Sequence, residues 1–393
     1  NDAWKYGAEN HSLDEGNFVF RKANAMKAYF EWMPIRLTHK NHIYRSFNVG
    51  TLLNLMILDT RHTDRDKQIE FSKYFSKEGF KFDNFYSDLN HTARKLIGNN
   101  QLEWLESKLK MNSAKWNVVA QQVLMTKIKF PDLTNDIDIS SLPAEVKDYL
   151  PITKLNLPSN LDAWDGYPAE RERIFKLFKS NKKTLISLAG DTHNSWVSKL
   201  HDLQGEGVGF EFGTPSVTSP GLLDIIKIDK NALEDSIIST NNEVRWMDAQ
   251  SRGFLNISIT KDEFVASFKY VNSVHQPQSG ISSIRKFVYK NSNLLKDSIS
   301  GLAELIYRFS NIIQCAMSIG FLKSINVFYP PKSKLFNCGY INMTIVKICF
   351  KLWHVQRQKS SVMRNGISTH WRSSLSNKFR NKIQSFYFSL LFI

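Results

Sequence analysis

Cysteine is scarce in this chain of 393 residues and is confined to its C-terminal part. The three cysteines are Cys315, Cys338 and Cys349, so residues 1–296 contain none. A region without cysteine can form neither a disulfide nor a thiolate metal site of its own. This absence excludes a disulfide scaffold for residues 1–296 and is compatible with either redox compartment.

Acidic residues are nearly absent from the same C-terminal part. Residues 297–393 hold 13 Lys and Arg but only two acids, Asp297 and Glu304. Residues 1–296 hold 39 basic and 35 acidic side chains, so most of the net charge of +15 lies in the tail. The basic pI of the whole chain therefore does not indicate a nucleic-acid partner for residues 1–296.

Long apolar runs and a start signal are also missing. No run reaches the roughly 18–20 apolar residues that a membrane-spanning helix needs. The chain opens directly on "NDAWKYGAENH", without an initiator methionine or a signal peptide. We therefore expect a fragment or a processed chain, whose export signal would have been lost upstream.

The character of the sequence changes after residue 296, which we predict to be a domain boundary. The apolar clusters of residues 297–393 show no sustained helical or strand period, and soluble surfaces normally mix both charge signs. We expect this basic, cysteine-containing tail to be a non-native extension, such as read-through or frameshifted sequence. A membrane-surface segment and a genuine accessory domain are the alternatives.

Residues 1–296 alternate between helical and strand patterns, which predicts an α/β fold layered on a buried sheet. The apolar run "SFNVGTLLNLMILDTR" indicates one central strand that is buried on both faces. Little periodicity at residues 126–160 indicates a long loop or lid. The remaining predicted elements are helices at 21–35, 100–112 and 169–181, strands at 116–125, 184–190 and 208–217, and a hairpin within 253–274.

Two of the predicted strands end in polar clusters, Asp59-Thr60-Arg61 and Gly190-Asp191-Thr192-His193. Open α/β sheets bind their ligands at the carboxyl ends of the strands. A carboxylate and an imidazole two residues apart can face one cation, and a metal held in this way can activate water against a phosphoryl group. Glycine and aspartate are also common in turns. The spacing alone leaves a metal site and a simple turn both open.

Eight segments that follow one another along the chain resemble the C-terminal portion of the PhoD-like alkaline phosphatases, a branch of the calcineurin-like metallophosphoesterases. The resemblance covers roughly residues 1–290. The segments are NDAWKYGAENH, RKANAMKAYFEWMPIR, IYRSFNVGTLLNLMILDTRHTDRDKQ, LIGNNQLEWLESKL, WNVVAQQVLM, DAWDGYPAERERIF, LAGDTHNSW and FGTPSVTSPG.

This resemblance implies a four-layer α/β sandwich of the metallophosphoesterase type. By the same match, Asp191 and His193 would be metal ligands in the catalytic centre. Asn1 matches the asparagine that follows the family's Asp-Asp-His-Glu segment and would contact metal or phosphate. The alternative for Asn1 is a frayed terminal residue. Metal-bound hydroxide would then hydrolyse phosphate mono- or diesters, with iron and calcium as the metals (other divalent ions are the alternative).

Arg36 and Arg61 follow apolar segments and carry fork-shaped donors that suit phosphate oxygens. Each could equally pair with a carboxylate such as Asp59 or Asp66, and we expect Asp59 to be a hydrogen-bonding anchor rather than a ligand. Nearby aromatic and acidic residues either line the substrate or pack in the interior. These residues are Trp164, Asp165 and Tyr167.

The chain departs from the family because the N-terminal half, with its further metal ligands, has no counterpart in it. We therefore expect a fold that is incomplete at the N-terminus, impaired activity and poor folding of the isolated chain. The resemblance implies a periplasmic or extracellular location. Two alternatives come from other classes: an inactive remnant or interaction protein that keeps the scaffold, and a nucleic-acid or anionic-surface binder that acts through residues 297–393.

Overall fold

The computed structural model describes residues 3–8, 11–33, 35, 42–133, 140, 147, 150–276, 279–290, 293–297 and 386–390. By its internal contacts the chain divides into two units, residues 1–299 with 385–393 and residues 300–384. The second unit lies outside the described residues, so the boundary predicted after residue 296 and the interpretations of the tail stay predictions. Asn1 and Arg36 also lie outside the described residues.

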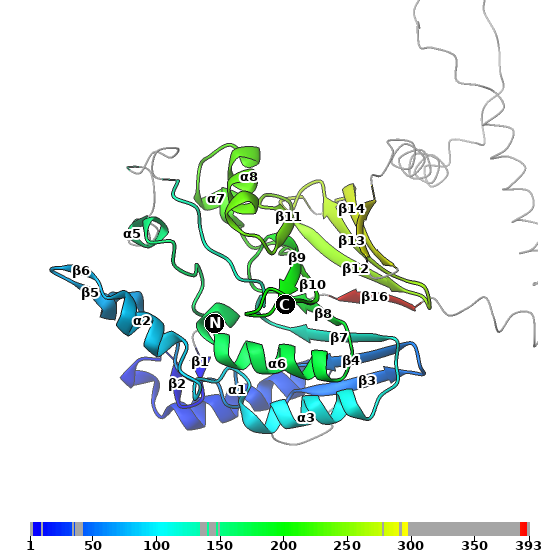
Figure 1. Ribbon diagram of the computed structural model, residues 1–393, viewed down its shortest axis with the longest axis horizontal. Helices are drawn as coiled ribbons and strands as arrows, with labels where there is room; N and C mark the ends of the chain where they lie inside the picture. The colour runs from blue at the N-terminus through cyan, green and yellow to red at the C-terminus, as the bar shows by residue number, and fades with distance from the viewer. Residues whose placement is uncertain are drawn as a thin grey trace, which may run out of the picture. The chain divides into compact units, whose positions relative to one another are not determined.

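A mixed seven-stranded sheet forms the centre of the first unit (Figure 1). The order of its strands is β11-β9-β10-β8-β7-β4-β3, and the four neighbours from β10 to β4 run parallel. Its strands are β3 (Arg45–Val49), β4 (Leu53–Ile57), β7 (Trp116–Gln121), β8 (Leu185–Ala189), β9 (Ser195–His201), β10 (Gly207–Gly213) and β11 (Val244–Asp248). Because β7 and β8 are central, every one of their residues is buried.

An antiparallel five-stranded sheet packs against one face of the large sheet. It has the order β15-β14-β13-β12-β16 and consists of β12 (Gly253–Ile259), β13 (Glu263–Val271), β14 (Ile281–Lys290), β15 (Asn293–Asp297) and β16 (Phe386–Leu390). Along β12 buried residues alternate with half-buried ones, as expected for a strand with one face on a core. The shared core includes Val118, Ile186 and Phe212 from the large sheet, and Ile257 and Phe268 from the small one.

Two amphipathic helices cover the opposite face of the large sheet, α3 (Gly98–Lys110) and α6 (Pro168–Ser180) (Figure 1). Leu105 and Leu109 of α3 and Ile174 and Phe178 of α6 are completely buried. They pack with Val119 and other residues that point from the sheet to this side. Three layers are therefore visible in the described part of the chain: helices, the large sheet and the small sheet.

Smaller elements surround these layers. The strand pairs are β1 (Ala3–Trp4) with β2 (Gly7–Ala8), and β5 (Phe75–Ser76) with β6 (Gly79–Phe80). The helices are α1 (Phe18–Trp32), α2 (Phe82–Leu89), α5 (Leu150–Lys154), α7 (Leu222–Ile225) and α8 (Lys230–Thr240). Within the described residues, no helix combines the length and the apolar character that crossing a membrane requires.

Most of the local predictions are confirmed, and one is wrong. The predicted helices correspond to α1, α3 and α6, at 21–35, 100–112 and 169–181. The predicted strands correspond to β7, β8 and β10, at 116–125, 184–190 and 208–217. The predicted hairpin corresponds to β12 and β13, within 253–274. The single strand predicted for "SFNVGTLLNLMILDTR" is in fact the antiparallel pair β3–β4. Gly50 has a φ of 49°, in the left-handed region, and turns the chain back at this point.

Candidate active site

The parallel strands β4, β7, β8 and β10 bring their carboxyl ends to one edge of the large sheet. Hydrogen bonds join the loops that follow them. Gln122, after β7, accepts from the backbone N–H and the hydroxyl of Thr60, and its own backbone carbonyl accepts from Gly190. Thr214, after β10, donates its N–H to the carbonyl of Ala189. The two predicted polar clusters therefore lie on one connected edge.

Asp191 and His193 have an unusual backbone conformation. Their φ angles are 73° and 61°, in the left-handed region that residues other than glycine seldom adopt. Two such residues within one short loop cost about 1–3 kcal/mol each and persist only where the surrounding structure holds them. Aspartate also tolerates this region in ordinary turns, and Asn156 and Lys182 adopt it shortly after α5 and α6. The backbone conformation alone therefore fits both a turn and a functional loop.

The ring of His193 is oriented by a backbone carbonyl. Its Nδ1 lies 2.8 Å from the carbonyl oxygen of Pro220. Since a carbonyl only accepts, Nδ1 carries the hydrogen, and Nε2 of the neutral ring keeps its lone pair. Histidines that bind metals are commonly fixed through their second nitrogen in this way. His193 thus has the arrangement expected of a ligand that binds through Nε2.

The carboxylate of Asp191 is half-buried and accepts no hydrogen bond from the described residues. Burial raises its pKa above the ordinary value, the charge of Arg61 lowers it, and Asp162 raises it again. The charge of His193 also lowers the pKa of Asp191, which places the two side chains within electrostatic range of each other. A cation bound there would supply the positive charge that this carboxylate lacks.

The described residues fit a metal at this edge only in part. Asp191 offers an oxygen ligand and His193 a nitrogen ligand, a pair suited to iron and other divalent ions. Among the described residues, however, no group of three or more His, Cys, Asp or Glu side chains is arranged to hold a metal ion. A complete centre therefore needs further ligands beyond this pair.

Arg61 is held by a carboxylate that the sequence did not single out, Asp162. The Nη1 and Nη2 atoms of Arg61 donate to Oδ1 and Oδ2 of Asp162 at 2.7 and 2.5 Å. Arg65 donates to Oδ1 of the same aspartate at 2.5 Å and to its backbone carbonyl at 2.7 Å. Of the predicted alternatives for Arg61, pairing with a carboxylate is therefore observed, but the partner is neither Asp59 nor Asp66. Contact with phosphate stays a prediction.

Asp59 anchors the loop after β4, as predicted. Its Oδ1 accepts from the backbone N–H groups of Arg61 and His62, at 2.9 and 2.8 Å. The carbonyl of Asp59 accepts from Gln101, whose own side-chain oxygen accepts from the N–H of Asp59. This loop is thus fixed to α3, which gives Arg61 a rigid base.

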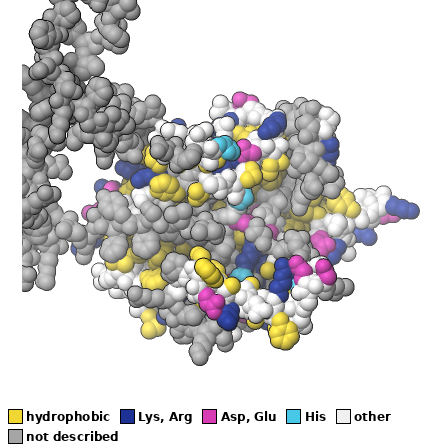
Figure 2. Space-filling model, turned by 180° about the vertical axis from the view of Figure 1, so that it is seen from behind, with side chains coloured by type: hydrophobic (Ala, Val, Ile, Leu, Met, Phe, Trp, Pro, Cys, Tyr) yellow, Lys and Arg dark blue, Asp and Glu magenta, His cyan; other side chains and the backbone are white. Residues whose placement is uncertain are grey.

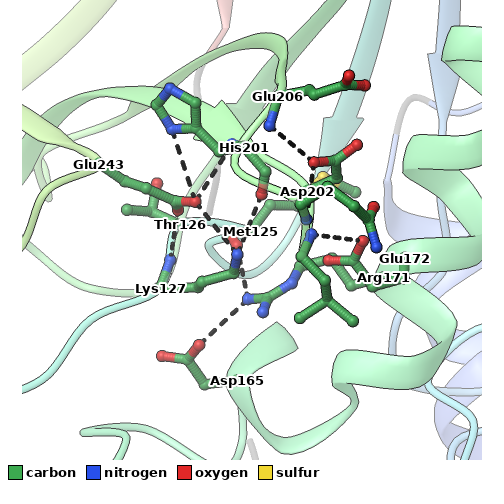
Figure 3. A network of polar contacts seen from close by, with 12 residues as sticks. Met125, Thr126, Lys127, Asp165, Arg171, Glu172, His201, Asp202, Glu206 and Glu243 are labelled. Atoms are coloured by element: carbon green, nitrogen blue, oxygen red, sulfur yellow. Dashed lines mark hydrogen bonds and ion pairs between the residues drawn. The ribbon is translucent and has the colours of Figure 1, made fainter.

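Trp164, Asp165 and Tyr167 pack in the interior, which supports the packing interpretation over the substrate-side one. Trp164 and Tyr167 are completely buried. Asp165 forms an ion pair with Arg171 at 3.1 Å (Figure 3). Its carboxylate also accepts the backbone N–H of Ile128. The segment therefore contributes to the scaffold, and only Asp162 at its start approaches the candidate site.

Histidine, acidic and basic side chains lie close together on one face of the molecule (Figure 2). The other histidines among the described residues include the exposed His91 and His275 and the half-buried His11, His62 and His201. His11 contacts the carbonyl of Gly16 and the guanidinium of Arg21. Among the described residues, none of these rings belongs to a group of three or more possible metal ligands.

Sequence reasoning missed three parts of this site: Asp162, Gln122 and the carbonyl of Pro220. Asp162 begins the segment "DAWDGYPAERERIF", so its presence in a matching motif was the available signal. Gln122 lies inside the strand predicted at 116–125, but β7 ends at Gln121, so Gln122 follows it directly, while Asp59 and Asp191 each come two residues after their strands. The contact with the carbonyl of Pro220 could not be predicted, because a backbone carbonyl is not visible in a pattern of side chains.

The fold and this edge define a layered α/β protein with a candidate hydrolytic centre at its strand ends. A family model described as PhoD-like phosphatase matches residues 1–268, more than half of the chain, and the chain therefore belongs to that family. This result confirms the resemblance drawn from the eight segments.

Two relatives give the extent of the similarity. Alkaline phosphatase D of Bacillus subtilis (strain 168) is 31% identical over 284 residues, which cover 70% of this chain and 42% of that protein. A solved structure, described as the structure of PhoD, matches with a TM-score of 0.59 at 27% identity, over 76% of this chain and 53% of that one. The chain thus spans about half of the length of the relatives it matches.

Proposed function

We propose that this chain carries part of a metal-dependent hydrolase that acts on phosphate mono- or diesters. The observation that supports this proposal is the sheet edge at which hydrogen bonds through Gln122 join the loop of Arg61 to the loop of Asp191 and His193, in a chain that belongs to the PhoD-like phosphatase family. Metal ligands beside a guanidinium form the arrangement that phosphoryl transfer requires.

In this proposal Asp191, His193 and Asn1 hold the metal, with iron and calcium as the candidates and other divalent ions as the alternative. When bound, such a metal lowers the pKa of its water and polarises the phosphoryl oxygen. Pro220 fixes the orientation of the His193 ring. Arg61 and Arg36 would donate to the non-bridging phosphate oxygens and stabilise the charge that develops on them.

The activity of this polypeptide by itself is proposed to be impaired. Among the described residues no group of three or more possible ligands is arranged to hold a metal ion, and the matched region covers 42% of alkaline phosphatase D. The four-layer sandwich belongs to the same proposal. Half-buried residues such as Phe254, Asn256 and Ser258 alternate along the outer face of β12, which a fourth layer would cover.

Hydrolysis of bis(p-nitrophenyl) phosphate and of p-nitrophenyl phosphate, with iron and calcium supplied, tests the proposed reaction. Removing a metal ligand should lower the rate of hydrolysis at least about 100-fold. We expect this loss for His193→Ala and no change for His91→Ala, which alters an exposed histidine. A rate that is insensitive to His193 would contradict the proposal.

An inactive scaffold or interaction protein is the second candidate function, favoured by the small number of ligands among the described residues. For this candidate we expect no hydrolysis above the background rate with any divalent metal. A measurable rate that depends on His193 would exclude it.

Location and further partners complete the proposal. By family membership, we propose a periplasmic or extracellular protein whose main partner is a phosphate ester.

Residues 297–393 would add contact with anionic surfaces, because they carry 13 basic side chains against two acids. Deleting them should abolish salt-sensitive binding to anionic vesicles. Unchanged binding after the deletion would contradict this role.

A further inference from the structure

Asp162 is the centre of a small buried cluster of charges. Two guanidiniums, from Arg61 and Arg65, share its single carboxylate. The side chain of Arg65 is 2% exposed, and that of Arg61 is 11% exposed. Arg61 is therefore the more accessible of the two cations that pair with Asp162.

The inner arginine has mainly structural contacts. Arg65 donates to the carbonyl of Thr60, and its guanidinium lies 5.1 Å from the ring centre of Tyr167. These contacts fix Arg65 on the side of the cluster that faces the core. Arg65 thereby fixes Asp162 from the side of the core, and Asp162 in turn pairs with Arg61.

The loop of the outer arginine is joined to the loop of the candidate metal ligand Asp191 through Gln122, which accepts from Thr60 with its side chain and from Gly190 with its backbone carbonyl. Arg61 and Asp191 act on each other electrostatically, and Asp162 also acts on Asp191. The two-point pairing between Arg61 and Asp162 fixes the plane of the guanidinium as well as its position. A lysine would have no such fork and could not be oriented in this way.

We propose that Asp162 is a positioning residue that presents Arg61, beside Asp191, to the phosphate group of the substrate. The inference rests on the proposed function, since it assigns how the phosphate is recognised at that site. A guanidinium that is already oriented binds an oxyanion without losing further side-chain entropy. Asp162 thus acts through Arg61 and does not contact the phosphate itself.

Binding of inorganic phosphate to the full chain, measured by isothermal titration calorimetry, tests this inference without depending on turnover. Asp162→Asn should weaken phosphate binding about tenfold or more, because the charge-assisted fork that orients Arg61 is lost. The matched control is Asp165→Asn, which removes a buried aspartate paired with Arg171 three positions along the same segment. It should leave phosphate affinity unchanged, and circular dichroism checks that both variants fold.

A second pair of variants separates positioning from general damage. In the Arg61→Gln background, adding Asp162→Asn should cause no further loss of affinity, because the residue through which Asp162 acts is absent. An equal loss in both backgrounds, an equal loss in Asp165→Asn, or an absence of phosphate binding in the unmodified chain would overturn the inference. Phosphate binding without hydrolysis would count against the proposed reaction and leave this inference standing.

Discussion

Buried carboxylates in this molecule are held by several donors each. Glu211 of β10 is completely buried and accepts from the backbone N–H groups of Met125 and Thr126, and from the hydroxyls of Thr126 and Ser187. Burial raises its pKa even though these donors favour the charged form. Such a residue holds the chain that leaves β7 against the neighbouring strands β8 and β10. Its role is to position the carboxyl edge of the sheet.

Asp165 should give the stability of the protein a distinct pH dependence. Burial raises its pKa from 3.8 to about 6, with Arg171 opposing the shift. Because the folded state binds the proton more tightly, the contribution of Asp165 to stability is full below pH 3.8 and is lost as pH rises through about 6.

Urea unfolding at several pH values measures this contribution. Between pH 7 and pH 5, the free energy of unfolding of the unmodified chain should rise relative to that of Asp165→Asn by on the order of 1 kcal/mol. A difference between the two proteins that stays constant with pH would show that Asp165 has an ordinary pKa.

Gly98 should not tolerate a side chain. Its φ is 77°, and a Cβ atom at this position would lie 2.3 Å from the Cβ of Asp64. Gly205 has a similar φ of 81°, but nothing lies within 4 Å of the corresponding position. The Gly205→Ala variant therefore has the backbone strain alone, which should lower the free energy of unfolding by about 1 kcal/mol. Gly98→Ala should lower the free energy of unfolding by about 2 kcal/mol more than Gly205→Ala does, because the added methyl group overpacks the site. Thermal unfolding measures both changes. Equal losses would disprove the steric contribution.

At the scale of elements, helix α3 begins without a capping side chain of its own and is capped by α6. The carboxylate of Glu170 accepts the backbone N–H groups of Leu96, Ile97 and Gly98. These are donors that the start of a helix leaves unpaired, and a negative charge there also suits the helix dipole. One side chain thus links the two helices that cover the sheet.

Glu170→Gln should therefore destabilise the fold by about 1–3 kcal/mol, because an amide has one acceptor oxygen and no charge to offer three donors. Chemical denaturation measures the change. Glu103→Gln, at an exposed position of α3, serves as the control and should change stability by less than about 0.5 kcal/mol. If the two variants lose the same stability, Glu170 is not a cap.

Local sequence patterns predicted the elements but not the way the sheet is assembled. The helical spacing in α3 and α6 and the apolar run of β8 are properties of adjacent residues, so they can be read without a fold. The hairpin β3–β4 was missed because Gly50 was read as part of one continuous apolar run. The pairing of β9 with β11 was not predicted, since it joins strands that lie far apart in the chain.

At the scale of the molecule, the same limit applies to the candidate site. Asp191 and His193 could be predicted because they follow one strand within three residues. Asp162 could not, because it is separated from Arg61 by 101 positions and meets it only through the packing of α6 against the sheet. The layered fold thus joins a locally encoded candidate pair, Asp191 and His193, to a charge cluster that no local pattern reveals.

Metal content after exhaustive dialysis tests the central claim most directly, namely that Asp191 and His193 bind a metal at the carboxyl edge of the sheet. The chain would be loaded with iron or calcium, dialysed and analysed by mass spectrometry beside Asp191→Asn, His193→Ala and Asp165→Asn. We predict stoichiometric metal in the unmodified chain and in Asp165→Asn, and loss of that metal in the other two variants. Metal retained at full occupancy in both of those variants, or absent from the unmodified chain, would contradict the account.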